Sequence, residues 1–511
     1  MDTRKLSQKI VKNTFFSIIG TFWMLGVSLL LTPYIIYKIG LEKFGIWAIA
    51  SSIVGFLGLF NLGTSNTYAK YIAEHHVMAD FTKINQTINT GLVINILLGS
   101  CMSVVFFFIT PIINFFKFDP GYFNETYFVV FVSIVIFIVV FISGIFNSVI
   151  QGMQRIDITN KINIFMSILN AIGVIIVLQY GWGLRGLVIN SGVVIMIAII
   201  IRIICACYLF PPLKLSVRFV KLNNFKEMVS FGSKIQVSKI ANFINDQVDK
   251  ILLGHFLGVL MVGYYDIGAR LTRSARRILL VMNPAIMPAA SELHSIKNKE
   301  RLFSLYNRAS KYLSIITIPL LFFIVTTAPI IISFWMGPGF ERSVLALRFL
   351  MIGFMINILT GVGTSIARGI GRPHLEMKYE LWVAVSNIVL SLILIIKIGF
   401  IGALIGTSVS LIIFSIYFMV IFHRQVLANS YLKFAKEIYS TPVLLSSSLC
   451  LLIYFVNLLL NNNFRIQGRI AYFTVLLVDI LIFGILYSIL VFKLRFLNMK
   501  EVKTIIKYAV L

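Results

Sequence analysis

Four arginines lie close together in the stretch "DIGARLTRSARRILLVMNPAIM", residues 266–287, which is otherwise largely apolar. They are Arg270, Arg273, Arg276 and Arg277. If the stretch is a helix, residues turn by about 100° each, so Arg270, Arg273 and Arg277 share an arc of about 60° with Asp266. The side chain of Arg276 lies outside this arc. Guanidinium groups bind phosphate oxygens in pairs, so this stripe favours a phosphorylated ligand.

A second polar stripe precedes the arginines. On a helix its members share an arc of about 80°: Lys234, Ser238, Asn242, Asn245 and Asp249. Asp246 and Lys239 lie beside this arc. We expect Lys234, Lys239, Asn242 and Asn245 to contact the same ligand as the arginines. Asp246, Asp249 and Asp266 are candidates for binding a coupling proton or Na⁺. Alternatively, Asp246 and Asp249 only close the helix and pair with Lys250.

The elements that carry these stripes belong to a membrane protein. The chain has 511 residues, of which 59% are hydrophobic and 13% charged. Apolar runs of about 20 residues recur from end to end, which predicts an all-α polytopic membrane protein. A β-barrel is excluded because its strands would alternate in hydrophobicity. The formal net charge of +26 does not indicate nucleic acid, because the basic residues lie in short loops between the spans.

The apolar runs predict fourteen membrane-spanning helices. Their cores are 14–35, 44–64, 88–112, 127–150, 161–180, 184–208, 228–247, 252–288, 312–336, 344–367, 377–397, 399–422, 438–460 and 470–492. The span 252–288 is too long for one crossing, so it either continues past the bilayer or combines a re-entry with a crossing. Lys and Arg concentrate in the even-numbered loops and the two ends, which predicts that both termini are cytoplasmic.

An internal repeat organises these spans. "QGMQR" at 151–155 matches "RGIGR" at 368–372, and Gly152, Asn170 and Gly45 match Gly369, Asn387 and Gly263. Each repeat holds six spans, so both copies begin on the same side of the membrane. We therefore expect an N-terminal lobe (1–222), a C-terminal lobe (223–425) and two extra C-terminal helices (426–511).

The depth of the arginines decides what they face. One arginine at the centre of a span costs about 2.5–3.5 kcal/mol to insert, and four facing lipid would cost on the order of 10 kcal/mol. The two polar stripes are therefore expected to line a water-filled cationic cavity. The alternative is that the arginines lie at the membrane edge and reach the interface or pair with nearby carboxylates.

The pattern "DKILLGHFLGVLMVGYY", residues 249–265, and the region "GLEKFGIWAIASSIVGFLGLFNLGTSN", residues 40–66, resemble the polysaccharide-biosynthesis (Wzx-like) oligosaccharide flippases. That family belongs to the multidrug, oligosaccharidyl-lipid and polysaccharide exporter superfamily. The resemblance implies a two-lobe, alternating-access transporter in the inner membrane that flips polyprenyl-pyrophosphate-linked oligosaccharide to the outer leaflet, for O-antigen or capsule. It also implies a polysaccharide polymerase and chain-length proteins as partners, beside the lipid bilayer.

Three other functions compete with this one. A lipid II-type flippase also has fourteen spans. A cation-coupled multidrug exporter of the same superfamily would carry cationic cargo, which four arginines would repel. A membrane glycosyltransferase or polymerase needs a large extramembrane loop, and the loops here are mostly short. No nucleotide-binding motif, catalytic triad, metal site or cofactor site is expected, so the chain is predicted not to be an enzyme.

Overall fold

The structure is a computed structural model that describes residues 3–61, 64–221, 240–241, 243–280, 283, 286–464, 468–494 and 496–497. Within these residues every regular element is a helix, as the all-α class predicted. The chain divides into two compact units, Met1–Gly263 and Tyr264–Leu511. The lobe limits at 222 and 425 stay predictions.

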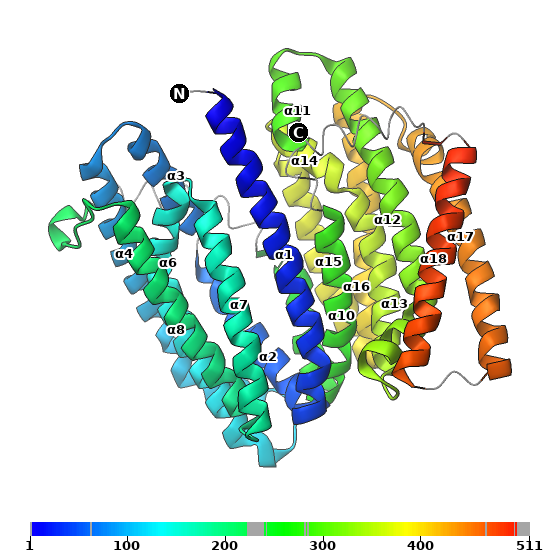
Figure 1. The fold of residues 1–511 in the computed structure, drawn as a ribbon, viewed down its shortest axis with the longest axis horizontal. Coiled ribbons are helices and arrows are strands. Elements are labelled where there is room, and N and C mark those ends of the chain that lie inside the picture. Colours follow the sequence, from blue (N-terminus) through cyan, green and yellow to red (C-terminus); the bar gives the residue numbers. More distant parts are fainter. Residues whose placement is uncertain are drawn as a thin grey trace. The chain divides into compact units, whose positions relative to one another are not determined.

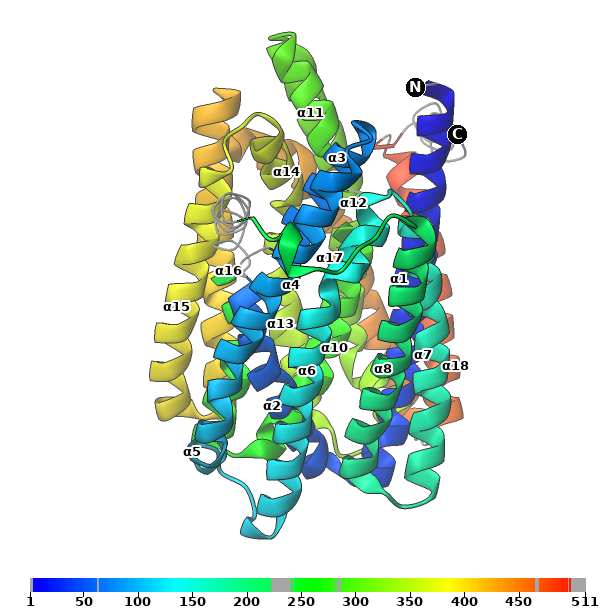
Figure 2. The same cartoon turned by 90° about the vertical axis from the view of Figure 1, so that its left-hand side faces the viewer.

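The first unit is a bundle of helices (Figure 1). They are α1 (Thr3–Ile39), α2 (Leu41–Leu57), α3 (Thr64–Val77), α4 (Phe81–Met102), α5 (Ile109–Asn114), α6 (Phe123–Gly152), α7 (Ile156–Gln179) and α8 (Gly183–Leu209). Residues 243–256 are also helical. α6 packs against α2, α3, α4 and α8 (Figure 2). α7 lies between α1 and α8 (Figure 1).

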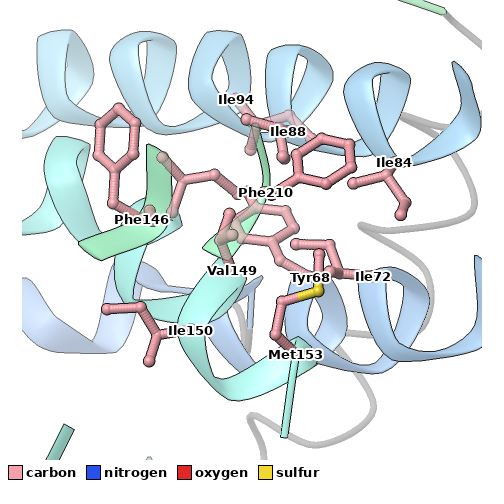
Figure 3. Close-up of a cluster of buried hydrophobic side chains, with 12 residues drawn as sticks. Tyr68, Ile72, Ile84, Ile88, Ile94, Phe146, Val149, Ile150, Met153 and Phe210 are labelled. Atoms are coloured by element: carbon pink, nitrogen blue, oxygen red, sulfur yellow. The ribbon is translucent and has the colours of Figure 1, made fainter. Parts of the chain in front are cut away.

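An apolar core joins α3, α4, α6 and α8 at one end of this bundle (Figure 3). Its buried members include Ile72, Ile88, Val149 and Phe210. Tyr68 is fully buried among them and donates its hydroxyl hydrogen bond to Asn95 Oδ1 at 2.9 Å. The packing of apolar faces therefore fixes how these four helices meet, and the buried hydroxyl of Tyr68 has its hydrogen-bond partner.

The second unit is a further helix bundle. Its helices are α10 (Val259–Leu279, whose first turn belongs to the first unit), α11 (Ile286–Ser295), α12 (Lys299–Met336), α13 (Glu341–Leu359), α14 (Gly361–Gly369), α15 (His374–Ile398), α16 (Phe400–Phe422), α17 (Tyr431–Phe464) and α18 (Arg469–Lys493). α12 packs against α13, α17 and α18, and α16 packs against α13 and α15. α17 and α18 thus extend the bundle beside α12 (Figure 1).

Twelve helices of the described residues are long and apolar enough to cross a membrane. The predicted spans 228–247 and 252–288 are not among them, so the count of fourteen stays a prediction.

The predicted bounds of these two spans were wrong where the structure describes them. The helix of residues 243–256 ends before Gly258, whose φ is +92°, and α10 then runs only to Leu279. A left-handed glycine interrupts a helix, and Pro284 disfavours helix just before it.

The predicted repeat appears as equivalent contacts inside each unit. A Cβ on Gly152 would lie 3.1 Å from the carbonyl oxygen of Ala69, and one on Gly369 would lie 2.5 Å from that of Met287. Gly369 lies 217 residues after Gly152, and Met287 lies 218 residues after Ala69. The α3–α6 contact and the α11–α14 contact are therefore the same packing, repeated.

A hydrogen bond between neighbouring spans repeats in the same way. Asn190 Nδ2 donates to Asn170 Oδ1 at 3.0 Å between α8 and α7, and Thr407 Oγ1 donates to Asn387 Oδ1 at 3.1 Å between α16 and α15. The offset is 217 residues for both partners. The sequence match of Asn170 with Asn387 is thus confirmed as a structural equivalence.

Candidate functional site

The arginine stripe lies on α10 and is organised around one buried carboxylate. Arg270 Nε lies 2.7 Å from Asp266 Oδ2, and Arg273 Nη2 lies 2.9 Å from Asp266 Oδ1. The Asp266 side chain is 2% exposed, whereas the two arginines are 26% and 24% exposed. The helical spacing therefore gives the predicted ion pair with Arg270 and adds one with Arg273. Two guanidinium groups and one carboxylate leave this trio with a formal charge of +1.

Close packing of the opposite face of α10 orients this stripe. A Cβ on Gly268 would lie 2.7 Å from the backbone nitrogen of Leu347 on α13. Ser343 Oγ, also on α13, donates to the carbonyl oxygen of Tyr264 at 2.9 Å. At about 100° per residue, Tyr264 and Gly268 lie opposite Asp266. The stripe must therefore point away from α13.

The other two arginines differ in their surroundings. Arg277 is exposed and shares the face of Arg270 and Arg273. Arg276 turns toward α13, where its guanidinium carbon lies 5.1 Å from the ring centroid of Phe354. Its Nε is buried and makes no hydrogen bond within the described part of the chain. Three of the four arginines thus form one surface, and the fourth packs on an aromatic ring.

The second predicted stripe is only partly described. Lys234, Lys239 and Asn242 lie outside the described residues. Asn245 is half-buried, and its Oδ1 is buried without a hydrogen bond to any described residue. Asp246 is half-buried, whereas Asp249 is fully buried beside Lys250, which is 4% exposed. These residues belong to the first unit, and Asp266 with the arginines belongs to the second.

Contacts with α2 hold the described part of that helix. Ser52 Oγ donates to Gln247 Oε1 at 2.8 Å, and the rings of Phe56 and Phe243 meet edge to face with centroids 4.8 Å apart. Sequence reasoning missed Gln247, although its polar side chain lies next to Asp246. This helix is therefore joined to α2 by one polar contact, at Gln247, and one aromatic contact, at Phe243.

Two charged residues within spans were also missed. Asp479 on α18 is 2% exposed and accepts a hydrogen bond from Asn457 Nδ2 of α17 at 2.8 Å. Arg202 on α8 donates from Nη2 to Asn163 Oδ1 of α7 at 2.9 Å. Single charged residues inside otherwise apolar runs were the available signal. No cluster of three or more metal-ligating side chains occurs in the described residues.

Comparison with known proteins places this geometry in context. Residues 10–294 match the family model described as polysaccharide biosynthesis protein. The chain is 23% identical over 411 residues to an inferred O-antigen transporter of Shigella flexneri. The alignment covers 79% of this chain and 95% of that protein. It is also 23% identical over 268 residues to an inferred low-salt glycan biosynthesis flippase of Haloferax volcanii, covering 52% of this chain and 54% of the relative.

A solved structure shares the fold. The lipid II flippase MurJ in an inward closed conformation superposes with a TM-score of 0.73 at 18% identity, covering 95% of this chain and 99% of the other. At this identity the likeness concerns the fold alone, and it agrees with the predicted two-lobe transporter architecture. These relatives are named as transporters and flippases, in agreement with the prediction that the chain is not an enzyme.

Proposed function

We propose that this chain, which belongs to the polysaccharide biosynthesis protein family, is a flippase for polyprenyl-pyrophosphate-linked oligosaccharide. It moves this cargo from the cytoplasmic to the outer leaflet by alternating access. The proposal rests chiefly on one observation, the cationic face of α10 built around Asp266. The names of the relatives, an O-antigen transporter and a glycan flippase, support the same class of cargo.

The geometry of α10 suits a pyrophosphate head group. Asp266 contacts Nε of Arg270 and Nη2 of Arg273, which holds both guanidinium groups on the same face of α10. A guanidinium carries five N–H donors in a planar fork, a geometry that matches the oxygens of a phosphate group. A pre-ordered arginine pair loses less conformational entropy on binding than two mobile side chains.

The remaining predicted residues take supporting roles in this proposal. Arg277 widens the cationic face, and Arg276 lines its side. Lys234, Lys239, Asn242 and Asn245 contribute donors for phosphate or sugar. Asp246, Asp249 and Asp266 are the candidates for ion coupling. The protein acts in the inner membrane with both termini in the cytoplasm, and it hands its cargo to polysaccharide polymerase and chain-length proteins.

A deletion in the source organism tests the function. The proposal expects lipid-linked oligosaccharide to accumulate in the deletion strain and surface polysaccharide to disappear. A plasmid copy with Arg270→Ala, Arg273→Ala and Arg277→Ala is expected to leave the intermediate accumulated at normal protein level. Normal polymer in the deletion strain would contradict the function. Normal polymer from the triple variant would contradict the role of the α10 arginines and would leave the proposed function standing.

A further inference from the structure

A polar cavity lies among the apolar helices α12, α13, α17 and α18 of the second unit. Its volume is about 300 Å³. Its polar lining consists of one arginine, three kinds of hydroxyl group and one amide: Arg348, Thr326, Ser333, Tyr454, Tyr472 and Asn457. All four helices are apolar enough to span a membrane, so a polar cavity between them needs an explanation.

Arg348 is the cation of this cavity. It lies two turns into α13, about 10 Å along the axis from the start of the helix at Glu341. Its Nε donates to the carbonyl oxygen of Val325 at 3.1 Å. Within the described part of the chain, no carboxylate lies at ion-pair distance from it. One carbonyl uses one of five guanidinium donors, so the site has donors and a full charge left for an anion.

The carboxylate on α18 does not supply that anion. Asp479 is 2% exposed, is bonded to Asn457 Nδ2, and does not line the cavity. The lining therefore combines a guanidinium with hydroxyl donors and contains no acidic group. This donor set is typical of sites that bind phosphate.

The cavity reaches the apolar outer face of α17. Tyr454 and Leu458 line it and are 51% and 46% exposed, and Leu451, one turn earlier on the same face, is 59% exposed. Large apolar side chains exposed along a membrane span face acyl chains. A ligand can therefore enter from the bilayer with its chains left on α17.

We propose that this cavity binds the phosphate head group of a bilayer glycerophospholipid, with Arg348 on the phosphate and the acyl chains along α17. The site is separate from the arginine face of α10 and does not depend on the cargo. It gives α17 and α18 a lipid-binding role in the second unit.

Native mass spectrometry of the purified full-length protein, delipidated in detergent, tests the proposal. The probes are phosphatidylglycerol, polyprenyl phosphate and inorganic phosphate. Arg348→Gln is expected to weaken phosphatidylglycerol binding about ten-fold, since it removes a charge-assisted contact. The matched control is Arg342→Gln, an exposed arginine on the same helix, which is expected to change binding less than about two-fold.

The other probes decide what the cavity accepts. The proposal expects inorganic phosphate not to displace phosphatidylglycerol, and expects Arg348→Gln to leave polyprenyl phosphate binding unchanged. Displacement by free phosphate, a selective loss of polyprenyl phosphate, or equal effects of the two arginine variants would each overturn it. If Arg348→Gln does not yield monodisperse protein, Tyr472→Phe removes one hydroxyl of the same cavity and is expected to weaken phosphatidylglycerol binding about three-fold. No change in that variant would overturn the proposal as well.

Discussion

Gly45 and Gly263 lie at a crossing where two helix backbones touch. A Cβ on Gly45 would lie 2.0 Å from the carbonyl oxygen of Val259, and one on Gly263 would lie 2.8 Å from that of Leu41. The two contacts are reciprocal, and both pairs are related by an offset of 218 residues. Such reciprocity is the mark of a local two-fold relation between repeats, here between α2 and the first turn of α10.

Gly45→Ala is therefore expected to destabilise the protein. Its new methyl group would meet backbone, which cannot rotate away as a side chain can. Overpacking of this kind costs about 1–3 kcal/mol. Thermal unfolding of the purified protein in detergent measures the effect as a lower Tm. The control is Gly26→Ala on α1, where no atom of the described residues lies within 4 Å of the new Cβ. An unchanged Tm for Gly45→Ala would show that the crossing is looser than described.

A double-mutant cycle measures the coupling between Asp266 and Arg270. Asp266→Asn removes the carboxylate that both arginines contact, and Arg270→Gln removes one of those contacts. We expect a coupling of about 1–2 kcal/mol in the free energy of unfolding. This is less than for a fully buried pair, because the arginine is partly exposed. The same cycle with Arg277, which makes no ion pair with Asp266, is expected to be additive. Equal coupling in both cycles would contradict the described geometry.

The ion pair on α10 was predictable because helical spacing alone brings Arg270 and Asp266 together. The surroundings of Arg276 were not, because the ring of Phe354 comes from another helix. The Asn457–Asp479 hydrogen bond joins two helices in the same way, and no periodicity reveals it. The bounds of the span 252–288 were wrong because the apolar pattern continues through Gly258, whereas the helix ends just before that residue.

Chemical labelling tests whether the arginine face meets water. In a variant lacking the four native cysteines, Arg277→Cys is expected to react with a charged maleimide about ten-fold faster than Ala275→Cys, which lies on the packed side and is 8% exposed as alanine. Thiols react as thiolates, which water stabilises and lipid does not.

Exposure to lipid is distinguished by a third position. Ile396 on α15 is 66% exposed, and Ile396→Cys is expected to react slowly because its surroundings are acyl chains. If Arg277→Cys labels no faster than Ile396→Cys, the arginine face does not line an aqueous chamber.

A flipping assay in proteoliposomes measures whether the arginine face of α10 is needed to move the cargo. Fluorescent polyprenyl-pyrophosphate-linked oligosaccharide is followed by quenching from outside, and the control is Arg342→Gln, which removes one exposed charge on α13. The account predicts that Arg270→Gln combined with Arg273→Gln slows the initial rate at least about ten-fold, while the control stays within about two-fold of wild type. A wild-type rate in the double variant would contradict it.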